Sequence, residues 1–273
     1  MSGFDLGPAA YTAGDQFQRE RHTLFKTSWL PFSASAQMPM PGDFVSHSIG
    51  GWPLLALRGD DGVARAFHNV CQHQRMPVVS QAAGNCERLR CSYHGWSYGR
   101  QGEFLTAPER FAPGGPPEQF GLQAAETVES GGICQARIAA GNAPPAAFGL
   151  AGSPLVDTLT TDIEANWKAV VESLLGTPDW RFVWPLAFLA EATEGSVVRQ
   201  IVPRTFLRTR IVDLIFAAGG AFDEAHRRRV AAEKAAAEAC QARRAAGDVT
   251  VSGDAVGSFL AKVAKACAET TDC

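Results

Sequence analysis

Two short pairs, each of a cysteine and a histidine, constrain the fold of this chain more than any other feature. The first pair is Cys71-Gln-His73, and the second, after 17 intervening residues, is Cys91-Ser-Tyr-His94. Thiolates and imidazoles ligate soft and borderline metals, so the spacing predicts two tight loops that bring four ligands to one centre. The alternative is two unrelated pairs, which the matched spacing disfavours.

The order of the ligands along the chain distinguishes between two kinds of metal centre. A Rieske centre holds one iron through two cysteines and the other through two histidines. Zinc also accepts two cysteines and two histidines, but zinc modules usually pair cysteine with cysteine and histidine with histidine along the chain. We therefore predict a Rieske-type [2Fe–2S] cluster held by Cys71, His73, Cys91 and His94, with zinc as the less favoured metal.

The residues around the motif predict a small antiparallel β domain over residues 41–150. Short apolar runs between 42 and 104 are separated by Gly-Asp and Asp-Gly turns, which is typical of strands joined by hairpins. We expect Gly95 to let the second loop pass close to a sulfur, and Trp96 to shield the cluster from water. A stretch rich in glycine and proline at 141–154 marks the predicted end of the domain.

Helical periodicity is prominent in the rest of the chain. Residues 1–40 are predicted to contain a docking helix at 15–30, which Pro31 is expected to end. A second domain is predicted over 151–273, with an amphipathic helix within 160–176 and two strands within 196–216. Further helices are expected at 222–246 and 254–268. Four arginines of the strand region are predicted to face largely outward: Arg199, Arg204, Arg208 and Arg210.

Composition excludes several classes of partner. The net charge of -3 over 273 residues gives no long-range attraction to polyanions, so nucleic acid is not expected as a partner. The chain has neither a basic start followed by an apolar stretch nor an uncharged run of the roughly 18 residues that span a membrane. Seven cysteines, an odd number, fit a reducing compartment, and we expect a cytoplasmic protein without a membrane partner. The cysteines outside the motif are expected to be plain thiols: Cys86, Cys134, Cys240, Cys267 and Cys273.

With these residues in view, the chain resembles the Rieske non-haem iron oxygenases, the large or alpha subunits of aromatic-ring-hydroxylating dioxygenases. The likeness runs through PMPGDFVSHSIGGWPLLALRGDDGVARAFHNVCQHQRMPVV and CSYHGWSYGRQGEFLTAPERF, and resumes at ANWKAVVES and WRFVWPLAFL. It implies an α+β fold in which a small antiparallel β Rieske domain precedes a helix-grip domain, a sheet wrapped on a helix. Met76 and Tyr93 stand where respiratory Rieske proteins have a bridging disulfide, which implies a centre of the oxygenase and ferredoxin kind.

The resemblance breaks where the family holds a second metal, a mononuclear Fe(II) bound by two histidines and a carboxylate. In the family, the helix that matches Asn166-Trp167-Lys168 and Glu172 runs into a segment with both histidines, but here GTPDWRFVWP follows with none. We therefore expect a shortened second domain without this iron. Asp223 stands where the family often places the carboxylate, which makes it a weak candidate ligand, and His226 is the only histidine beyond His94. The remaining histidines are expected to be packed or surface residues: His22, His47 and His68.

Three hypotheses for function follow. The first is an oxidoreductase component without its own O2-activating iron, which accepts electrons from a reductase or ferredoxin and passes them to a mononuclear iron on a partner subunit. It implies a homo- or hetero-oligomer with oxygenase-type subunits. The second is a terminal oxygenase, a mono- or dioxygenase or demethylase with an atypical iron site. The third is a non-catalytic subunit that keeps the cluster for redox sensing or for stability.

Overall fold

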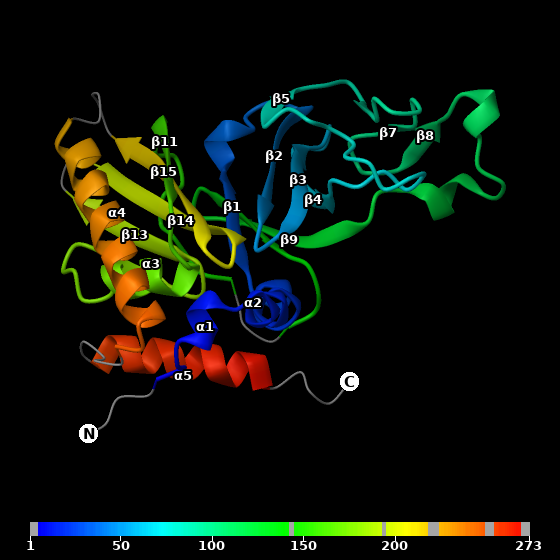
Figure 1. The fold of residues 1–273 in the computed structure, drawn as a ribbon. Coiled ribbons are helices and arrows are strands. Elements are labelled where there is room, and N and C mark those ends of the chain that lie inside the picture. Colours follow the sequence, from blue (N-terminus) through cyan, green and yellow to red (C-terminus); the bar gives the residue numbers. More distant parts are fainter. Residues whose placement is uncertain (1–4, 142–144, 193–194, 218–223, 249–253, 269–273) are drawn as a thin grey trace. The chain divides into compact units, whose positions relative to one another are not determined.

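The computed structural model describes residues 5–141, 145–192, 195–217, 224–248 and 254–268, and its chain divides into two compact units (Figure 1). The first, here called the β unit, contains Pro31–Ala139 and Ala147–Ala151. The second, here called the α+β unit, contains Met1–Leu30, Ala140–Ala146 and Gly152–Cys273. Helices and antiparallel sheets occur together, so the chain has the predicted α+β class.

Two antiparallel sheets build the β unit. The larger has seven strands in the order β1-β10-β9-β4-β3-β2-β5, and the smaller has three in the order β6-β7-β8. The strands are β1 (Leu30–Ala34), β2 (Asp43–Ile49), β3 (Trp52–Arg58), β4 (Ala64–His68), β5 (Ala83–Asn85), β6 (Leu89–Arg90), β7 (Ser97–Tyr98), β8 (Phe104–Thr106), β9 (Ala124–Ser130) and β10 (Ile133–Arg137). Short 3-10 turns are η2 (Ser35–Gln37), η3 (Glu109–Phe111) and η4 (Pro117–Phe120).

One hydrophobic core connects the larger sheet to the loops that carry the predicted ligands. Its buried members are Phe44, Leu55, Leu57, Phe67, Cys71, Val78, Leu89, Cys91, Trp96, Tyr98 and Leu122. Leu55 of β3 lies opposite Phe67 of β4, so cross-strand packing fixes the register of this part of the sheet. Because Cys71 and Cys91 belong to the same core, the sheet holds both thiols in place.

The predicted docking helix is present, but it contains a π turn and ends at residue 27, before the predicted residue 30. Helices α1 (Ala9–Thr12) and α2 (Gly14–Glu20) are followed by a π turn, η1 (Arg21–Phe25), and strand β1 then begins at Leu30. Pro31 therefore lies inside a strand instead of ending a helix at 30. Since β1 is the edge strand of its sheet, the missing N–H of a proline is tolerated there.

The α+β unit contains a five-stranded antiparallel sheet in the order β11-β15-β14-β13-β12. Its strands and first long helix are β11 (Leu155–Ile163), α3 (Trp167–Leu174), β12 (Arg181–Val183), β13 (Ala187–Ala192), β14 (Gly195–Thr205) and β15 (Arg208–Ala217). The two strands expected within 196–216 are β14 and β15. The helix expected within 160–176 starts only at Trp167, because Asn166 caps it and the preceding residues form β11.

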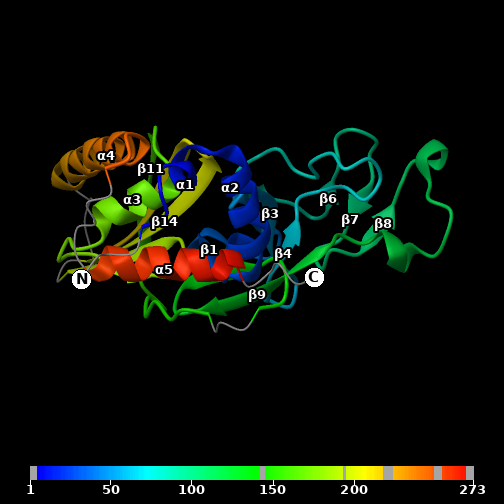
Figure 2. The same ribbon diagram turned by 60° about the horizontal axis from the view of Figure 1, so that its bottom comes forward.

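Two helices complete the α+β unit, α4 (Glu224–Ala245) and α5 (Asp254–Ala268), where the sequence places them. Helix α4 packs against α3, and α5 lies against η1 (Figures 1 and 2). Phe259 of α5 meets the ring of Trp167 edge to face, with centroids 5.6 Å apart. Within the described residues, no helix is long and apolar enough to cross a membrane.

Candidate functional site

The two loops that carry the predicted ligands have the same backbone construction. In the first, Cys71 N–H donates to Met76 O and Arg75 N–H donates to Cys71 O. In the second, Cys91 N–H donates to Trp96 O and Gly95 N–H donates to Cys91 O. Each loop is therefore a tight turn closed at its cysteine, with the histidine inside the turn.

The fifth residue of each loop takes a left-handed conformation, with φ of 58° at Arg75 and 74° at Gly95. A side chain is tolerated at the first position but not at the second. A Cβ on Gly95 would lie 3.3 Å from Cγ of Pro108, in addition to the backbone strain. The atoms nearest to such a Cβ belong to Pro108 and Arg90, so the close approach at Gly95 is to these side chains and not to the sulfur that the sequence analysis expects.

The loops bring the four predicted ligands together as two pairs. Cys71 and Cys91 are each 2% exposed, and their thiols are close enough to interact. The imidazole rings of His73 and His94 have centroids 4.7 Å apart. Within the described residues, no three His, Cys, Asp or Glu side chains converge on one point as the ligands of a single ion do. A thiol pair beside an imidazole pair matches a group with two metal atoms, each taking two protein ligands.

The Nδ1 atoms of His73 and His94 are buried and have no hydrogen-bond partner. Buried polar atoms are nearly always hydrogen-bonded, so two orphaned ring nitrogens side by side indicate a ligand-binding role. Burial, with the charges of His73 and Arg110, lowers the pKa of His94, which favours the neutral imidazole that binds metal. The donor set therefore fits a [2Fe–2S] group.

Tyr98 of β7 supports the first cysteine. Its hydroxyl lies 3.1 Å from Sγ of Cys71 and accepts a hydrogen bond of 3.0 Å from the backbone N–H of Gln72. Since the phenol oxygen accepts from Gln72, its own proton is free to point at the sulfur. Burial raises the pKa of the Cys71 thiol, while this hydrogen bond opposes the rise. Tyr98 is fully buried, so it is a fixed donor toward a thiolate.

Aromatic rings enclose the imidazoles. Trp96 stacks on His73 with centroids 5.1 Å apart and an interplanar angle of 7°, and it is 3% exposed. Its indole N–H donates to the backbone O of Phe111. The ring centroids of Phe111 and His94 are 4.1 Å apart. Trp96 therefore excludes water from this side, as the sequence predicts. The ring centroids of Tyr93 and His94 are 4.0 Å apart, and Tyr93 is 57% exposed. The side of the site formed by the two imidazoles therefore lies close to the surface.

Comparison with known proteins agrees with this geometry. Residues 28–114 match the family described as the Rieske [2Fe-2S] domain. The naphthalene 1,2-dioxygenase system large oxygenase component of Pseudomonas aeruginosa is 38% identical over 122 residues, which are 43% of this chain and 27% of that protein. The biphenyl 2,3-dioxygenase subunit alpha of Rhodococcus jostii is 35% identical over 122 residues, 44% of this chain and 26% of that protein.

This chain contains a Rieske [2Fe-2S] domain and is similar in sequence to large subunits of Rieske dioxygenases. Its match covers about a quarter of the length of these curated relatives. Solved structures share the fold over nearly the whole chain. The quaternary ammonium Rieske monooxygenase CntA in complex with L-carnitine has a TM-score of 0.79 at 16% identity, covering 95% of this chain and 94% of that one. Naphthalene 1,2-dioxygenase with indole bound has a TM-score of 0.69 at 17% identity, covering 97% and 92%.

Two supporting residues of the Rieske site escape sequence analysis, Tyr98 and Asn69. The buried Asn69 side chain makes four hydrogen bonds: Oδ1 accepts from the N–H groups of Val78 and Val79, and Nδ2 donates to Val79 O and Ser46 Oγ. These hydrogen bonds hold the backbone of Val78 and Val79, just beyond the first loop, against Asn69, just before it. A polar amide at the end of an apolar strand, two residues before a predicted ligand, is the only sequence signal for it.

In the α+β unit, the residues that match the family's helix motif form buried polar contacts. Nζ of Lys168 lies 2.6 Å from one carboxylate oxygen of Glu20, and the Trp167 indole N–H donates to the other at 2.7 Å. Glu172 accepts from the Tyr11 hydroxyl and from the Arg244 guanidinium. These contacts join α3 to α1, α2 and α4. The motif residues therefore have a structural role in this chain.

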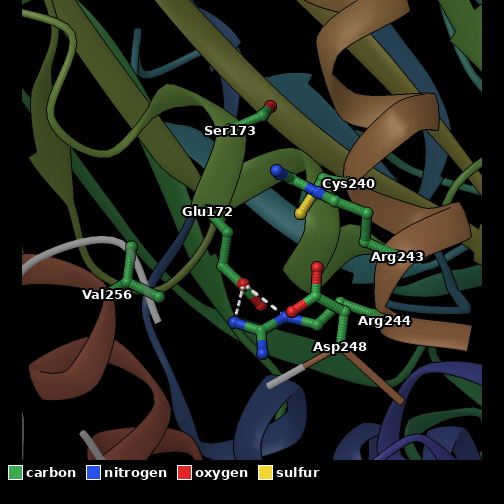
Figure 3. A pocket seen from close by; sticks show the side chains of 7 residues that line it. All are labelled: Glu172, Ser173, Cys240, Arg243, Arg244, Asp248 and Val256. Carbon is green, nitrogen blue, oxygen red and sulfur yellow. Dashed lines mark hydrogen bonds and ion pairs between the residues drawn. The ribbon is translucent and has the colours of Figure 1, made fainter. Parts of the chain in front are cut away.

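Figure 3 shows the side chains that line a small cavity in this unit, among them the ion pair of Glu172 and Arg244. Its volume is about 50 Å³, and Cys240, Arg243 and Asp248 line it further. Pockets for organic ligands usually have volumes of roughly 300–1,000 Å³. The cavity is therefore too small for an aromatic substrate.

The prediction that Arg199 faces outward is wrong. Its side chain is 0% exposed and forms an ion pair with Asp213, directly opposite on β15, and another with Glu233 of α4. The strand alternation that exposes Arg208 and Arg210 turns Arg199 to the core, where two carboxylates neutralise it. Nε2 of His226 donates to the carboxylate of the same Asp213 at 2.9 Å. Asp223, the weak iron candidate, lies outside the described residues.

The other thiols and histidines named in the sequence analysis are not among the four predicted ligands. Among the described residues, Cys86, Cys134, Cys240 and Cys267 are free, and Cys273 lies outside the described residues. His47 stacks on Phe32 with centroids 4.1 Å apart, as expected of a packed histidine.

Proposed function

We propose that Cys71, His73, Cys91 and His94 ligate a Rieske [2Fe–2S] cluster, with the thiolates on one iron and the imidazoles on the other. The observation that carries this proposal is the pair of buried Nδ1 atoms without hydrogen-bond partners, beside two buried thiols. The match to the Rieske domain supports it independently. When bound, the cluster accepts and releases one electron at a time.

We propose further that the chain is an electron-transfer component. It accepts electrons from a reductase or ferredoxin and passes them to a mononuclear iron on a partner subunit, within a homo- or hetero-oligomer. Support comes from relatives named as large oxygenase components of dioxygenase systems, and from a structurally similar quaternary ammonium Rieske monooxygenase in which electron transfer between subunits is described. The thin cover over His94, where Tyr93 is exposed, also favours transfer to another protein at this edge.

The protein supplies orientation, hydrogen bonds and exclusion of water. The two matched turns hold one thiol and one imidazole each, so both loops stay registered to one another. Tyr98 donates to the Cys71 sulfur and stabilises negative charge there, and Trp96 keeps water from His73. Burial raises the pKa of the Cys71 thiol, and the positive charge of a bound metal centre would favour its thiolate form.

The proposal includes the absence of a mononuclear iron from this chain. Beyond His94 the sequence has one histidine, His226, and its Nε2 is engaged by Asp213, which Arg199 also neutralises. The competing function is a terminal oxygenase with an atypical iron site. It is favoured by the similarity of fold to CntA over 95% of the chain.

The test is purification under anaerobic conditions with counts of iron, zinc and acid-labile sulfide. We expect two irons and two sulfides per chain, a reddish-brown colour and, after reduction, an EPR signal with an average g value below that of an all-cysteine cluster. His73→Ala and Cys91→Ala should each remove the iron, the sulfide and the colour. Cys86→Ala changes a thiol outside the site and serves as the matched control. Zinc in place of iron would contradict the cluster. A third iron lost in His226→Ala, together with O2-dependent activity, would favour the terminal oxygenase.

A further inference from the structure

A second cavity of the α+β unit differs from that of Figure 3 in size and in charge. It lies where α5 packs against η1, and residues of α2 and of the segment before α1 complete its wall (Figure 2). Its volume is about 510 Å³, which falls within the roughly 300–1,000 Å³ of pockets for organic ligands. Four polar residues line this cavity, here called the α5 cavity: Gln16, Arg19, Thr23 and Cys267.

Arg19 is the only charged side chain among the residues that line the α5 cavity. It is exposed, and it forms no ion pair with any residue that the structure describes. The other polar residues have partners within the protein. Gln16 donates to Glu20 at 3.2 Å, and the Thr23 hydroxyl donates to the backbone O of Arg19 at 2.9 Å. Sγ of Cys267 lies 3.7 Å from the same hydroxyl. The cavity therefore presents one cation that lacks a counter-charge.

The carboxylate behind the cavity wall does not supply that counter-charge. Glu20 is fully buried, and one of its oxygens lies 2.6 Å from Nζ of Lys168. The other oxygen accepts from the Trp167 indole N–H. Because Lys168 neutralises Glu20 within the interior, the positive charge of Arg19 remains available to a ligand.

The remaining wall of the α5 cavity is apolar. It is formed by Leu6 and by two alanines one helical turn apart on α5, Ala264 and Ala268. Small apolar side chains leave room beside a hydrocarbon group and provide no hydrogen-bond partner for a second polar group. A matching ligand therefore has one anionic group and a short apolar body.

We propose that the α5 cavity binds a small organic carboxylate, whose anionic group lies on the Arg19 guanidinium and whose apolar body lies against Leu6, Ala264 and Ala268. A planar guanidinium can donate two parallel N–H bonds to one carboxylate, so a single arginine suffices for this group. A phosphate carries more charge, whereas the cavity has one cation. The proposal does not depend on the cluster, since all of these residues belong to the α+β unit.

The experiment titrates the full-length holoprotein by isothermal calorimetry with hexanoate and with hexanamide, which has the same apolar body without the charge. Hexanoate should bind saturably and about tenfold more tightly than hexanamide, because a hydrogen bond to a charged group is worth more than a neutral one. Arg19→Gln should lower the affinity for hexanoate about tenfold, to that for the amide. Arg21→Gln is the matched control, since the Arg21 guanidinium donates to Gln18 and does not line the cavity.

Two further measurements locate the bound probe. Hexanoate should slow the alkylation of Cys267 by neutral iodoacetamide, read by fragment-resolved mass spectrometry, because Cys267 lines the cavity. The rate at Cys86, in the β unit, should not change. Ala264→Trp should fill the cavity and abolish hexanoate binding, with iron content and helical circular dichroism as checks of the fold.

Equal affinities for hexanoate and hexanamide, or unchanged binding of hexanoate in Arg19→Gln, would overturn the carboxylate assignment. Absence of saturable binding by hexanoate, octanoate and benzoate alike would overturn the site. Tighter binding of inorganic phosphate than of these three carboxylates, lost in Arg19→Gln, would assign the cavity to phosphate instead. Failure of the cluster would appear separately, as missing iron and sulfide in the unaltered protein.

Discussion

The two units of this chain treat buried polar groups in opposite ways. In the α+β unit, every buried side-chain nitrogen or oxygen that the structure describes has a hydrogen-bond partner, and the charges of Lys168 and Arg199 are neutralised by carboxylates. In the β unit, the buried atoms without one include the Nδ1 atoms of His73 and His94, whose rings lie side by side. A unit whose buried polar groups are all hydrogen-bonded within the protein needs no ligand to satisfy them. A unit that leaves ligands unsatisfied depends on something it must bind.

The largest effect expected from this difference follows removal of the metal. Stripping iron with a chelator under reducing conditions should unfold the loops 71–77 and 91–95, because the binding free energy of a metal centre contributes to folding. Hydrogen exchange should show protection lost in these loops while peptides of α3 and α4 keep theirs. Equal loss of protection in both units would contradict the contrast.

The second effect tests the self-sufficient interior. Asp213→Asn leaves the buried Arg199 with one carboxylate in place of two, and should lower the free energy of unfolding by about 3 kcal/mol. Urea denaturation of the holoprotein measures this, with iron content expected to stay unchanged. Asp162→Asn is the control, because its pair with Arg210 is exposed and is worth less than about 1 kcal/mol.

The third effect is a pH dependence of stability. Burial by itself would raise the pKa of Asp213, but hydrogen bonds from Arg199 and His226 hold it below its ordinary value of 3.8. A carboxyl whose pKa is lower in the folded state stabilises the fold above the unfolded pKa, and that contribution is lost as pH falls through the folded one. The free energy of unfolding, measured by urea denaturation, should therefore decline below about pH 4. The contribution of this group to the slope is up to ~1.4 kcal/mol per pH unit. The same titration of Asp213→Asn should show a shallower decline.

The smallest effect concerns the electron-transfer site. Tyr98→Phe removes the hydrogen bond to Sγ of Cys71, so the more negative reduced state loses more stabilisation, and the reduction potential should fall by on the order of 50 mV, or about 1 kcal/mol. Protein-film voltammetry or a dye titration measures it. Tyr93→Phe, which alters a phenol on the exposed side of His94, should leave the potential nearly unchanged.

The β unit follows from the sequence further than the α+β unit does. The pairing of Cys71, His73, Cys91 and His94 in two turns is local, since each turn is closed by hydrogen bonds within six residues. Tyr98 and Asn69 could not be recognised, because their partners depend on how distant loops meet. Arg199 was misplaced for a related reason: its partner Asp213 lies on the next strand, and only the register shows that the two face each other. Pro31 suggested a helix end, whereas its place at a sheet edge depends on tertiary pairing.

The matched turns have a consequence for how the β unit would fail. Each turn provides one sulfur and one nitrogen, and the structure groups sulfur with sulfur and nitrogen with nitrogen. In the proposed site, each metal atom therefore has one ligand from each turn. The centre thus cross-links two segments twenty residues apart in the chain through two metal atoms. Opening either turn would strip a ligand from both irons at once. Damage to such a centre should be all-or-none, without a stable one-iron remnant.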